Sequence, residues 1–164
     1  MRPLKPWSMM LEYYNMPEKT VEAFRDLWYH TGDYLRRDAE GNYYFVDRKK
    51  DALRRRGRNI SSFEVETIIN GHPDVAASAA VPVRSELLED EVMVCIELKE
   101  GATLTGEALV GWCAEHMAAF MVPRYVRFVA SMPRTPSLRI QKHVLREAGV
   151  TADTWDREAA ANQP

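Results

Sequence analysis

The chain has 164 residues, of which 46% are hydrophobic and 28% are charged; its formal net charge is −2 and its pI is near 6.1. This is the composition of an ordinary globular protein with room for one domain, or for one small domain and part of another. The near-neutral charge excludes a general attraction to nucleic acid or to an anionic membrane. No stretch approaches the ~18 apolar residues of a membrane-spanning helix. We therefore expect no nucleic-acid partner and no membrane partner.

The cysteines and histidines indicate no metal site. Cys95 and Cys113 stand alone in apolar stretches, which predicts two buried, reduced thiols and a cytoplasmic location. The four histidines show no spacing typical of metal ligands. No bound metal is predicted for this segment.

The first part of the chain predicts a helix and a hairpin but no complete domain. A short helix is expected near Pro17, with Asn15 as its cap. The turn "DAEG" separates two strands expected near 33–37 and 42–47. The aromatic, Met-rich start has no earlier element to pack on and looks like sequence from the middle of a domain, so residues 1–47 are not expected to complete a domain by themselves.

The remainder of the chain predicts one small domain. A capping box of Ser61 and Glu64 begins a helix that Gly71 and Pro73 end. The elements expected after it are strands in "DVAASAAVPV" and "DEVMVCIELKEG", a helix over 105–120, a strand in "RYVRFVA", a proline-bounded loop and a last helix. This order predicts an α+β fold in which helices pack on a three-stranded sheet. Residues 151–164 are expected to be a polar, frayed tail.

Two charged residues flank the predicted hairpin. Asp33 follows a Gly turn, and a carboxylate held there can accept two hydrogen bonds from a vicinal diol such as that of a ribose. Arg48 closes the second strand, and its planar guanidinium suits a phosphate or ribose oxygen. Taken alone, Asp33 is better explained as a turn or cap residue, and Arg48 is better explained as half of an exposed salt bridge.

A basic run follows the hairpin. Seven of the eleven residues from 48 to 58 are Lys or Arg, and the run leads into the N-terminus of the predicted helix. Basic side chains, a flexible glycine and free backbone N–H groups favour a phosphate-bearing ligand. A solvated loop explains the run equally well. Nucleic acid is disfavoured, because stacking aromatics are missing and Glu64 and Glu66 would repel a phosphate backbone.

The stretch "PRTPSLRIQK" is a third candidate. Pro133 and Pro136 stiffen a loop that presents Arg139 and Lys142, and such a loop can deliver a cation to a distant site. Exposed basic residues near the start of a helix are common, so this signal is weak by itself.

The order and spacing of three stretches are more specific. "YHTGD", "GNYYFVDRKKDALRRRGRNISSFEVE" and "PRTPSLRIQK" resemble the downstream motifs of adenylate-forming enzymes, and the middle stretch looks most like the carnitine/crotonobetaine branch of the acyl-CoA ligases. The resemblance implies that residues 1–49 are a hairpin stub at the C-terminal end of the large adenylation domain. It implies that residues 50–150 are the small, mobile C-terminal lid domain.

The resemblance also implies nucleotide and hinge residues. Asp33 matches the carboxylate that holds the ribose hydroxyls of ATP, and Arg48 matches the arginine that also contacts the ribose. Lys50 falls at the hinge about which the small domain swings between two poses. In the first pose such enzymes make an acyl adenylate and pyrophosphate from a carboxylic acid and ATP. Mg²⁺ would accompany ATP without ligands from this segment.

In the second pose of these enzymes, CoA attacks the acyl adenylate and AMP leaves. The loop around Gly57 would then line the pantetheine tunnel. Charge and position suggest that Arg55 and Arg58 could meet the CoA phosphates. The small-molecule partners implied are thus a carboxylic acid, ATP and CoA.

The last motif departs from the family pattern P-x-T-x-S-G-K-x-x-K. Leu138 stands at the Gly position, and Arg139 stands at the position of the catalytic Lys. That lysine stabilises the charge that develops during adenylation, and Arg is not a neutral replacement for it. Three alternatives follow: Arg139 acts in its place, Lys142 reaches in, or adenylation is impaired.

The family's nucleotide-phosphate loop, acyl pocket and upstream adenine-binding segment have no counterpart in this sequence. We therefore expect the C-terminal fragment of an ATP-dependent acyl-CoA ligase that is inactive alone. The alternative is a non-catalytic, free-standing module that binds CoA or a partner and has a degenerate catalytic loop. The acyl substrate is not indicated by any residue present.

Overall fold

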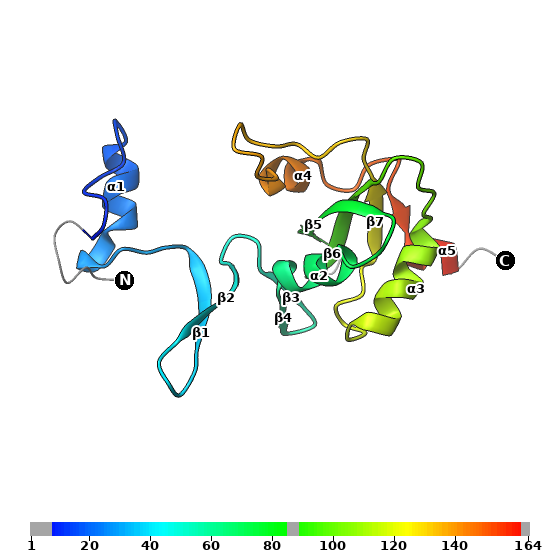
Figure 1. The fold of residues 1–164 in the computed structure, drawn as a ribbon, viewed down its shortest axis with the longest axis horizontal. Helices are drawn as coiled ribbons and strands as arrows, with labels where there is room; N and C mark the ends of the chain where they lie inside the picture. Colours follow the sequence, from blue (N-terminus) through cyan, green and yellow to red (C-terminus); the bar gives the residue numbers. More distant parts are fainter. Residues whose placement is uncertain (1–7, 85–88, 162–164) are drawn as a thin grey trace. The chain divides into compact units, whose positions relative to one another are not determined.

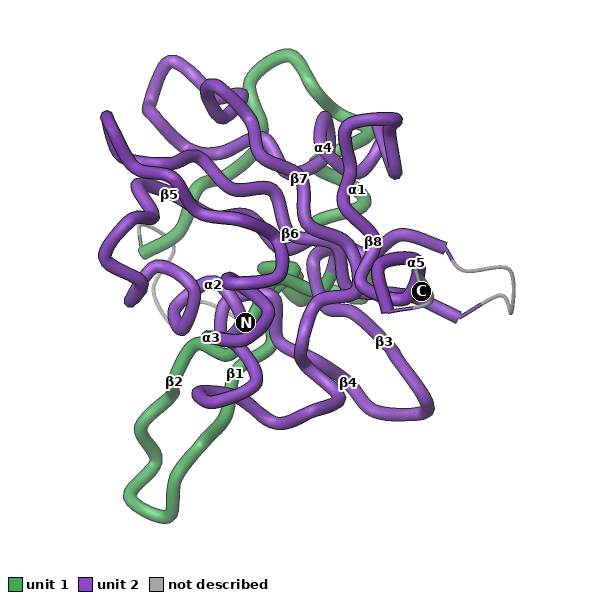
Figure 2. The backbone as a smooth tube through the Cα atoms, turned by 90° about the vertical axis from the view of Figure 1, so that its right-hand side faces the viewer, with its two compact units in different colours: residues 1–49 green, residues 50–164 purple. Residues whose placement is uncertain are grey.

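The computed structural model describes residues 8–84 and 89–161. The chain divides into two compact units, residues 1–49 and residues 50–164 (Figure 2). The middle of the charged connection predicted between the first two strands of the small domain, residues 85–88, lies outside the described residues. No helix in the described ranges is long and apolar enough to cross a membrane.

Unit 1 is a helical segment followed by a β-hairpin. Its elements are α1 (Pro17–Ala23), the 3-10 turn η1 (Arg25–Leu27), β1 (Asp33–Arg37) and β2 (Tyr43–Arg48). The predicted hairpin is confirmed, with antiparallel pairing from Asp33 opposite Arg48 to Arg37 opposite Tyr43. The predicted cap is wrong. Met16, not Asn15, occupies the cap position and makes no side-chain cap, because Asn15 lies in the preceding turn with φ +52°.

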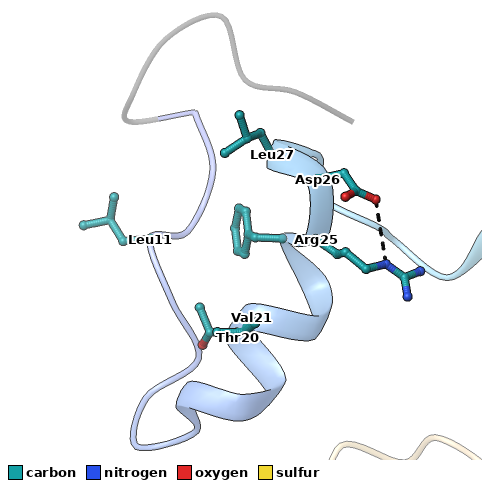
Figure 3. Close-up of a pocket in the computed structure, with 7 residues that line it drawn as sticks. Leu11, Thr20, Val21, Arg25, Asp26 and Leu27 are labelled. Atoms are coloured by element: carbon teal, nitrogen blue, oxygen red, sulfur yellow. Dashed lines mark ion pairs between the residues drawn. The ribbon is translucent and has the colours of Figure 1, made fainter.

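Unit 1 has no apolar core among its described residues. Asp47 is the single buried side chain there, whereas several large apolar side chains are exposed. Leu11, Val21 and Leu27 line a surface hollow of about 540 Å³ beside α1 (Figure 3). None of the predicted site residues lines this hollow.

Unit 2 is built on a sheet with the strand order β5-β6-β7-β8 (Figure 1). The strands are β5 (Val75–Arg84), β6 (Asp90–Leu98), β7 (Tyr125–Phe128) and β8 (Trp155–Asp156). β5 and β6 are antiparallel, β7 runs parallel to β6, and β8 is antiparallel to β7. A small sheet-and-helix domain is confirmed, but the sheet has four strands rather than the three predicted.

The extra strand comes from the segment expected to be a frayed tail. Trp155 packs against Gly106 at the start of α3, where an added Cβ would lie 2.6 Å from the indole Cδ2. Arg124 also pairs with Asp156 at 3.1 Å and with Glu158 at 2.8 Å. These partners lie more than thirty residues away in sequence. The local polarity of the tail therefore misled the prediction.

Helices cover both faces of the sheet. They are α2 (Ser62–Ile69), α3 (Gly106–His116), α4 (Lys142–Ala148) and the terminal α5 (Arg157–Ala161). On one face, Val94 of β6 lies in a core with Val65 of α2 and Leu109 of α3. On the other face, Met93 lies in a second core with Leu145 of α4. The central strand is therefore buried on both sides.

One predicted helix boundary in unit 2 is confirmed, and another differs from the structure. The capping residue of α2 is confirmed, because the Ser61 side chain accepts a hydrogen bond from the Glu64 backbone N–H. The helix expected over 105–120 ends at His116, since Met117 adopts an extended conformation with φ −141°. The residues after it connect α3 to β7, and this connection contributes to the candidate site.

Candidate functional site

Asp33 and Arg48 face each other at the open end of the β1–β2 hairpin. The Arg48 Nη1 atom lies 3.0 Å from Asp33 Oδ1. The Asp33 side chain is 21% exposed and that of Arg48 is 55% exposed. The hairpin register makes this pair, because it places the first residue of β1 opposite the last residue of β2. A carboxylate that accepts and a guanidinium that donates thus stand side by side, which fits the oxygens of a ribose diol.

Lys50 is exposed and is the first residue of unit 2. Just before it, the Lys49 N–H donates to the Gly32 carbonyl at 2.7 Å, which closes the hairpin. Just after it, the Asp51 carboxylate contacts Arg146 of α4 at 2.7 Å. The predicted pivot therefore lies between one residue held within unit 1 and one held within unit 2.

The basic run folds into a hairpin that was not predicted. β3 (Leu53–Arg55) and β4 (Arg58–Ile60) pair antiparallel around the two-residue turn Arg56-Gly57. Both turn residues have positive φ, +50° and +72°. This is the geometry of a type I′ turn, whose twist matches that of antiparallel strands. A Gly at the second turn position was the available signal, and it was interpreted as a flexible loop.

Arg55 does not occupy the position expected of a CoA ligand. Its side chain is only 3% exposed, and its Nε contacts Glu91 at 2.8 Å. Burial lowers the pKa of the Arg55 guanidinium, and the Glu91 carboxylate opposes that shift. A guanidinium enclosed in this way offers no exposed donors to a CoA phosphate.

The two remaining CoA candidates are exposed. Gly57 lies at the tip of the turn, and a Cβ added there would meet no atom within 4 Å. The Arg58 guanidinium lies 4.8 Å from the centre of the Phe120 ring, a cation–π contact that orients the side chain without removing its charge. The hairpin tip can therefore approach a phosphate-bearing ligand.

Arg139 lies in a tight turn between Pro133 and α4. The Thr135 N–H donates to the Arg139 carbonyl at 2.8 Å, and the Arg139 N–H donates to Thr135 Oγ1 at 3.1 Å. Leu138, at the family's Gly position, has φ +63° and is 75% exposed. The backbone thus keeps the left-handed conformation that suits Gly, although Leu is present. Arg139 is exposed at the end of this turn.

Lys142 is the first residue of α4 and is engaged inside unit 2. Its Nζ lies 2.7 Å from Glu66 Oε1 and donates to Ser62 Oγ at 2.9 Å. The same Glu66 oxygen accepts from the Ala80 N–H at 2.7 Å. The Lys142 side chain is 18% exposed. These contacts connect the start of α4 to α2 and β5.

The described residues contain no group of three or more His, Cys, Asp or Glu side chains that could hold a metal ion. Cys95 and Cys113 are buried free thiols. Burial raises the pKa of each to about 11, so both are protonated at neutral pH and are poor nucleophiles.

Sequence and fold comparisons show which known proteins the chain is similar to. Residues 64–139 match the family described as the AMP-binding enzyme C-terminal domain. This match agrees with the resemblance to adenylate-forming enzymes that the motifs of the chain implied.

Among curated relatives, the crotonobetaine/carnitine–CoA ligase of Proteus sp. (strain LE138) is 40% identical over 139 residues, which are 84% of this chain and 27% of the relative. The mitochondrial medium-chain acyl-CoA ligase ACSF2 of Bos taurus is 39% identical over 88% of this chain and 24% of its own length. The chain therefore spans about a quarter of the length of these relatives.

Solved structures give the same result for the fold. The amide bond synthetase McbA from Marinactinospora thermotolerans superposes with a TM-score of 0.74 at 31% identity, over 87% of this chain and 29% of that protein. ATP-bound MatB from Rhodopseudomonas palustris superposes with a TM-score of 0.74 at 32% identity, over 84% and 28% of the two chains.

Proposed function

We propose that this chain supplies the C-terminal domain and the preceding hairpin of an ATP-dependent acyl-CoA ligase. The ligase converts a carboxylic acid, ATP and CoA to acyl-CoA, AMP and pyrophosphate through an acyl adenylate. The observation that carries the proposal is the Asp33–Arg48 pair. Arg48 lies two residues before Lys50, which is the first residue of unit 2. The chain alone is inactive in this proposal, because no acyl pocket or nucleotide-phosphate loop is present in its sequence.

In the adenylation step, the substrate carboxylate attacks the α-phosphate of ATP and pyrophosphate leaves. Asp33 accepts hydrogen bonds from the ribose hydroxyls, and Arg48 donates to a ribose oxygen. Arg139 stabilises the negative charge that grows between the carboxylate and the α-phosphate. Mg²⁺ accompanying ATP would neutralise phosphate charge; the described residues include no cluster of His, Cys, Asp or Glu side chains that could hold it.

Arg139 is better placed for this role than Lys142. Arg139 is exposed on a closed turn and has a permanent charge. Lys142 would have to leave Glu66 and Ser62 to reach a substrate. The contacts of Lys142 instead support a structural role at the start of α4.

In the thioester-forming step, unit 2 pivots at Lys50, and the β3–β4 turn faces CoA. Gly57 allows close approach of the pantetheine arm because it has no side chain, and Arg58 meets a CoA phosphate. Arg55 has no direct part in this contact. A reducing, cytoplasmic compartment is supported by the two buried free thiols.

A chimera tests the proposal. This chain replaces the matching C-terminal portion of the Proteus crotonobetaine/carnitine–CoA ligase, and ATP–pyrophosphate exchange and acyl-CoA formation are both measured. We expect both activities. We also expect Arg139→Ala to lower exchange at least tenfold, or about 1.4 kcal/mol, and Arg139→Lys to retain it. The matched control is Arg36→Ala on the exposed β1 strand. A loss below tenfold for Arg139→Ala would remove its direct role.

The alternative function is a non-catalytic module that binds CoA or a partner. The replacement of the family's Gly-Lys pair by Leu138 and Arg139 favours it. It predicts a folded chimera with no exchange activity, together with heat of binding when CoA is titrated into this chain by itself. Exchange activity in the chimera rules this alternative out.

A further inference from the structure

The buried side chain of Arg55 connects the β3–β4 hairpin to the rest of unit 2. We propose that Arg55 is a positioning residue for the thioester-forming half-reaction: it sets where the Arg56-Gly57 turn and Arg58 lie, without touching CoA. This inference rests on the proposed function, because it assigns a role within the second of its two steps.

The guanidinium of Arg55 joins three segments that are distant in sequence. Its Nε contacts Glu91 Oε2 at 2.8 Å, at the beginning of β6. Its Nη1 donates to the carbonyls of Phe120 and Val122, each at 3.2 Å, in the connection between α3 and β7. The hairpin is thus fastened both to the central sheet and to the segment that follows α3.

The chemistry of these contacts requires an arginine. The Phe120 and Val122 carbonyls lie beyond the end of α3, so they have no partner from the next helical turn. A planar guanidinium can serve two carbonyls and a carboxylate at once from one enclosed position. A lysine would offer a compact ammonium on a flexible stem, which cannot hold the same spread of acceptors in one plane.

Other contacts near the Arg56-Gly57 turn also fix the position of the β3–β4 hairpin. The Arg54 N–H donates to Asp90 Oδ2 at 3.2 Å, and the Arg56 N–H donates to Glu89 Oε2 at 3.0 Å. Arg58 lies over the ring of Phe120, whose carbonyl Arg55 holds. The position of Arg58 therefore depends on Arg55 through Phe120.

The turn that presents Arg139 does not depend on this arrangement. It is closed by Thr135 and is followed by the Lys142–Glu66 pair. None of the contacts given above for Arg55 involves these residues. Loss of the Arg55 contacts should therefore disturb the thioester-forming step and spare adenylation.

The test uses the chimera described above and measures the two half-reactions separately. Arg55→Met removes the guanidinium. The double variant Arg55→Met/Glu91→Leu removes the charge of both partners, so that no buried carboxylate is left unpaired and the fold is kept. We expect acyl transfer to CoA to fall at least tenfold or the KM for CoA to rise at least tenfold in the double variant. ATP–pyrophosphate exchange should stay within twofold.

The matched control is Arg127→Met. Arg127 is another arginine of unit 2, and its ion pair with Asp153 at 3.1 Å lies outside the hairpin; both half-reactions should be unchanged. An equal loss of both half-reactions in the folded double variant overturns the inference, and so does an unchanged transfer step. If the unsubstituted chimera performs neither half-reaction, the proposed function itself fails, which is a distinguishable result.

Discussion

The two turns of unit 2 that present an arginine are held in different ways. The Arg56-Gly57 turn belongs to a regular β-hairpin and depends on a buried ion pair between Arg55 and Glu91. The turn before Arg139 is closed by the backbone and hydroxyl of Thr135, and it contains Leu138 in a conformation that suits Gly. The Arg56-Gly57 turn is supported by residues distant in sequence, whereas the turn before Arg139 is supported mainly by residues of the turn itself.

This difference matters because neither turn sequence reveals it. Both stretches are basic and both are exposed at the tip. The hairpin is connected to the core of unit 2 through Arg55, so a change in its support should cost more stability than a change in the Arg139 turn. The Arg139 turn can change locally while the core stays intact. Substitutions in the support of each turn test this contrast.

Removing the buried guanidinium should have the largest effect. Arg55→Met leaves Glu91, which is 12% exposed, without its cation. We expect the free energy of unfolding to fall by about 3–5 kcal/mol. Arg55→Met/Glu91→Leu should lose less, because it leaves the Phe120 and Val122 carbonyls without their donor but leaves no carboxylate unpaired. Urea denaturation followed by circular dichroism measures both. Arg139→Ala is the matched control and should lie within about 0.5 kcal/mol of the parent. A small effect of Arg55→Met would mean that the two turns do not differ in support.

The anchor behind the Arg139 turn should have an intermediate effect. Lys142→Met leaves the Glu66 carboxylate, which is largely buried, with the Ala80 N–H and without the ammonium. We expect a loss of about 1–3 kcal/mol in the free energy of unfolding. Glu66→Gln keeps an acceptor for Ala80, so it should cost less than Lys142→Met. If Lys142→Met proved neutral in denaturation but abolished ATP–pyrophosphate exchange in the chimera, Lys142 rather than Arg139 would be the cation of adenylation.

The two left-handed positions should respond with opposite signs. Gly57→Ala places a Cβ at φ +72° and should lower the free energy of unfolding by about 1 kcal/mol. Leu138→Gly removes a side chain from a residue with φ +63° and should raise the free energy of unfolding by about 0.5–1 kcal/mol. The greater conformational entropy of glycine in the unfolded chain partly offsets this gain. Thermal denaturation of both variants checks the signs. A destabilising Leu138→Gly would show that the Leu138 side chain makes a favourable contact after all.

Much of the local structure could be predicted from short sequence patterns. The β1–β2 hairpin is signalled by the turn "DAEG" and by the aromatic and β-branched run "NYYFVDR" after it, and its strands lie within one residue of the predicted ones. Ser61 begins α2 as its capping pattern predicts. The three motif stretches, taken in order, indicate the adenylate-forming family, and residues 64–139 match the AMP-binding enzyme C-terminal domain.

The tertiary structure alone decided which of the similar basic side chains are available. Arg54, Arg55 and Arg58 look alike in the sequence, but only Arg55 is buried, because Glu91 and the carbonyls after α3 meet its side chain. β8 is likewise held by contacts distant in sequence, because Trp155 packs against Gly106 of α3. Residue type and spacing determine caps, turns and strand patterns, which involve neighbours along the chain. The burial and ion pairing of a charged side chain such as Arg55 depend on residues brought together only by folding, and so they could not be predicted from the sequence.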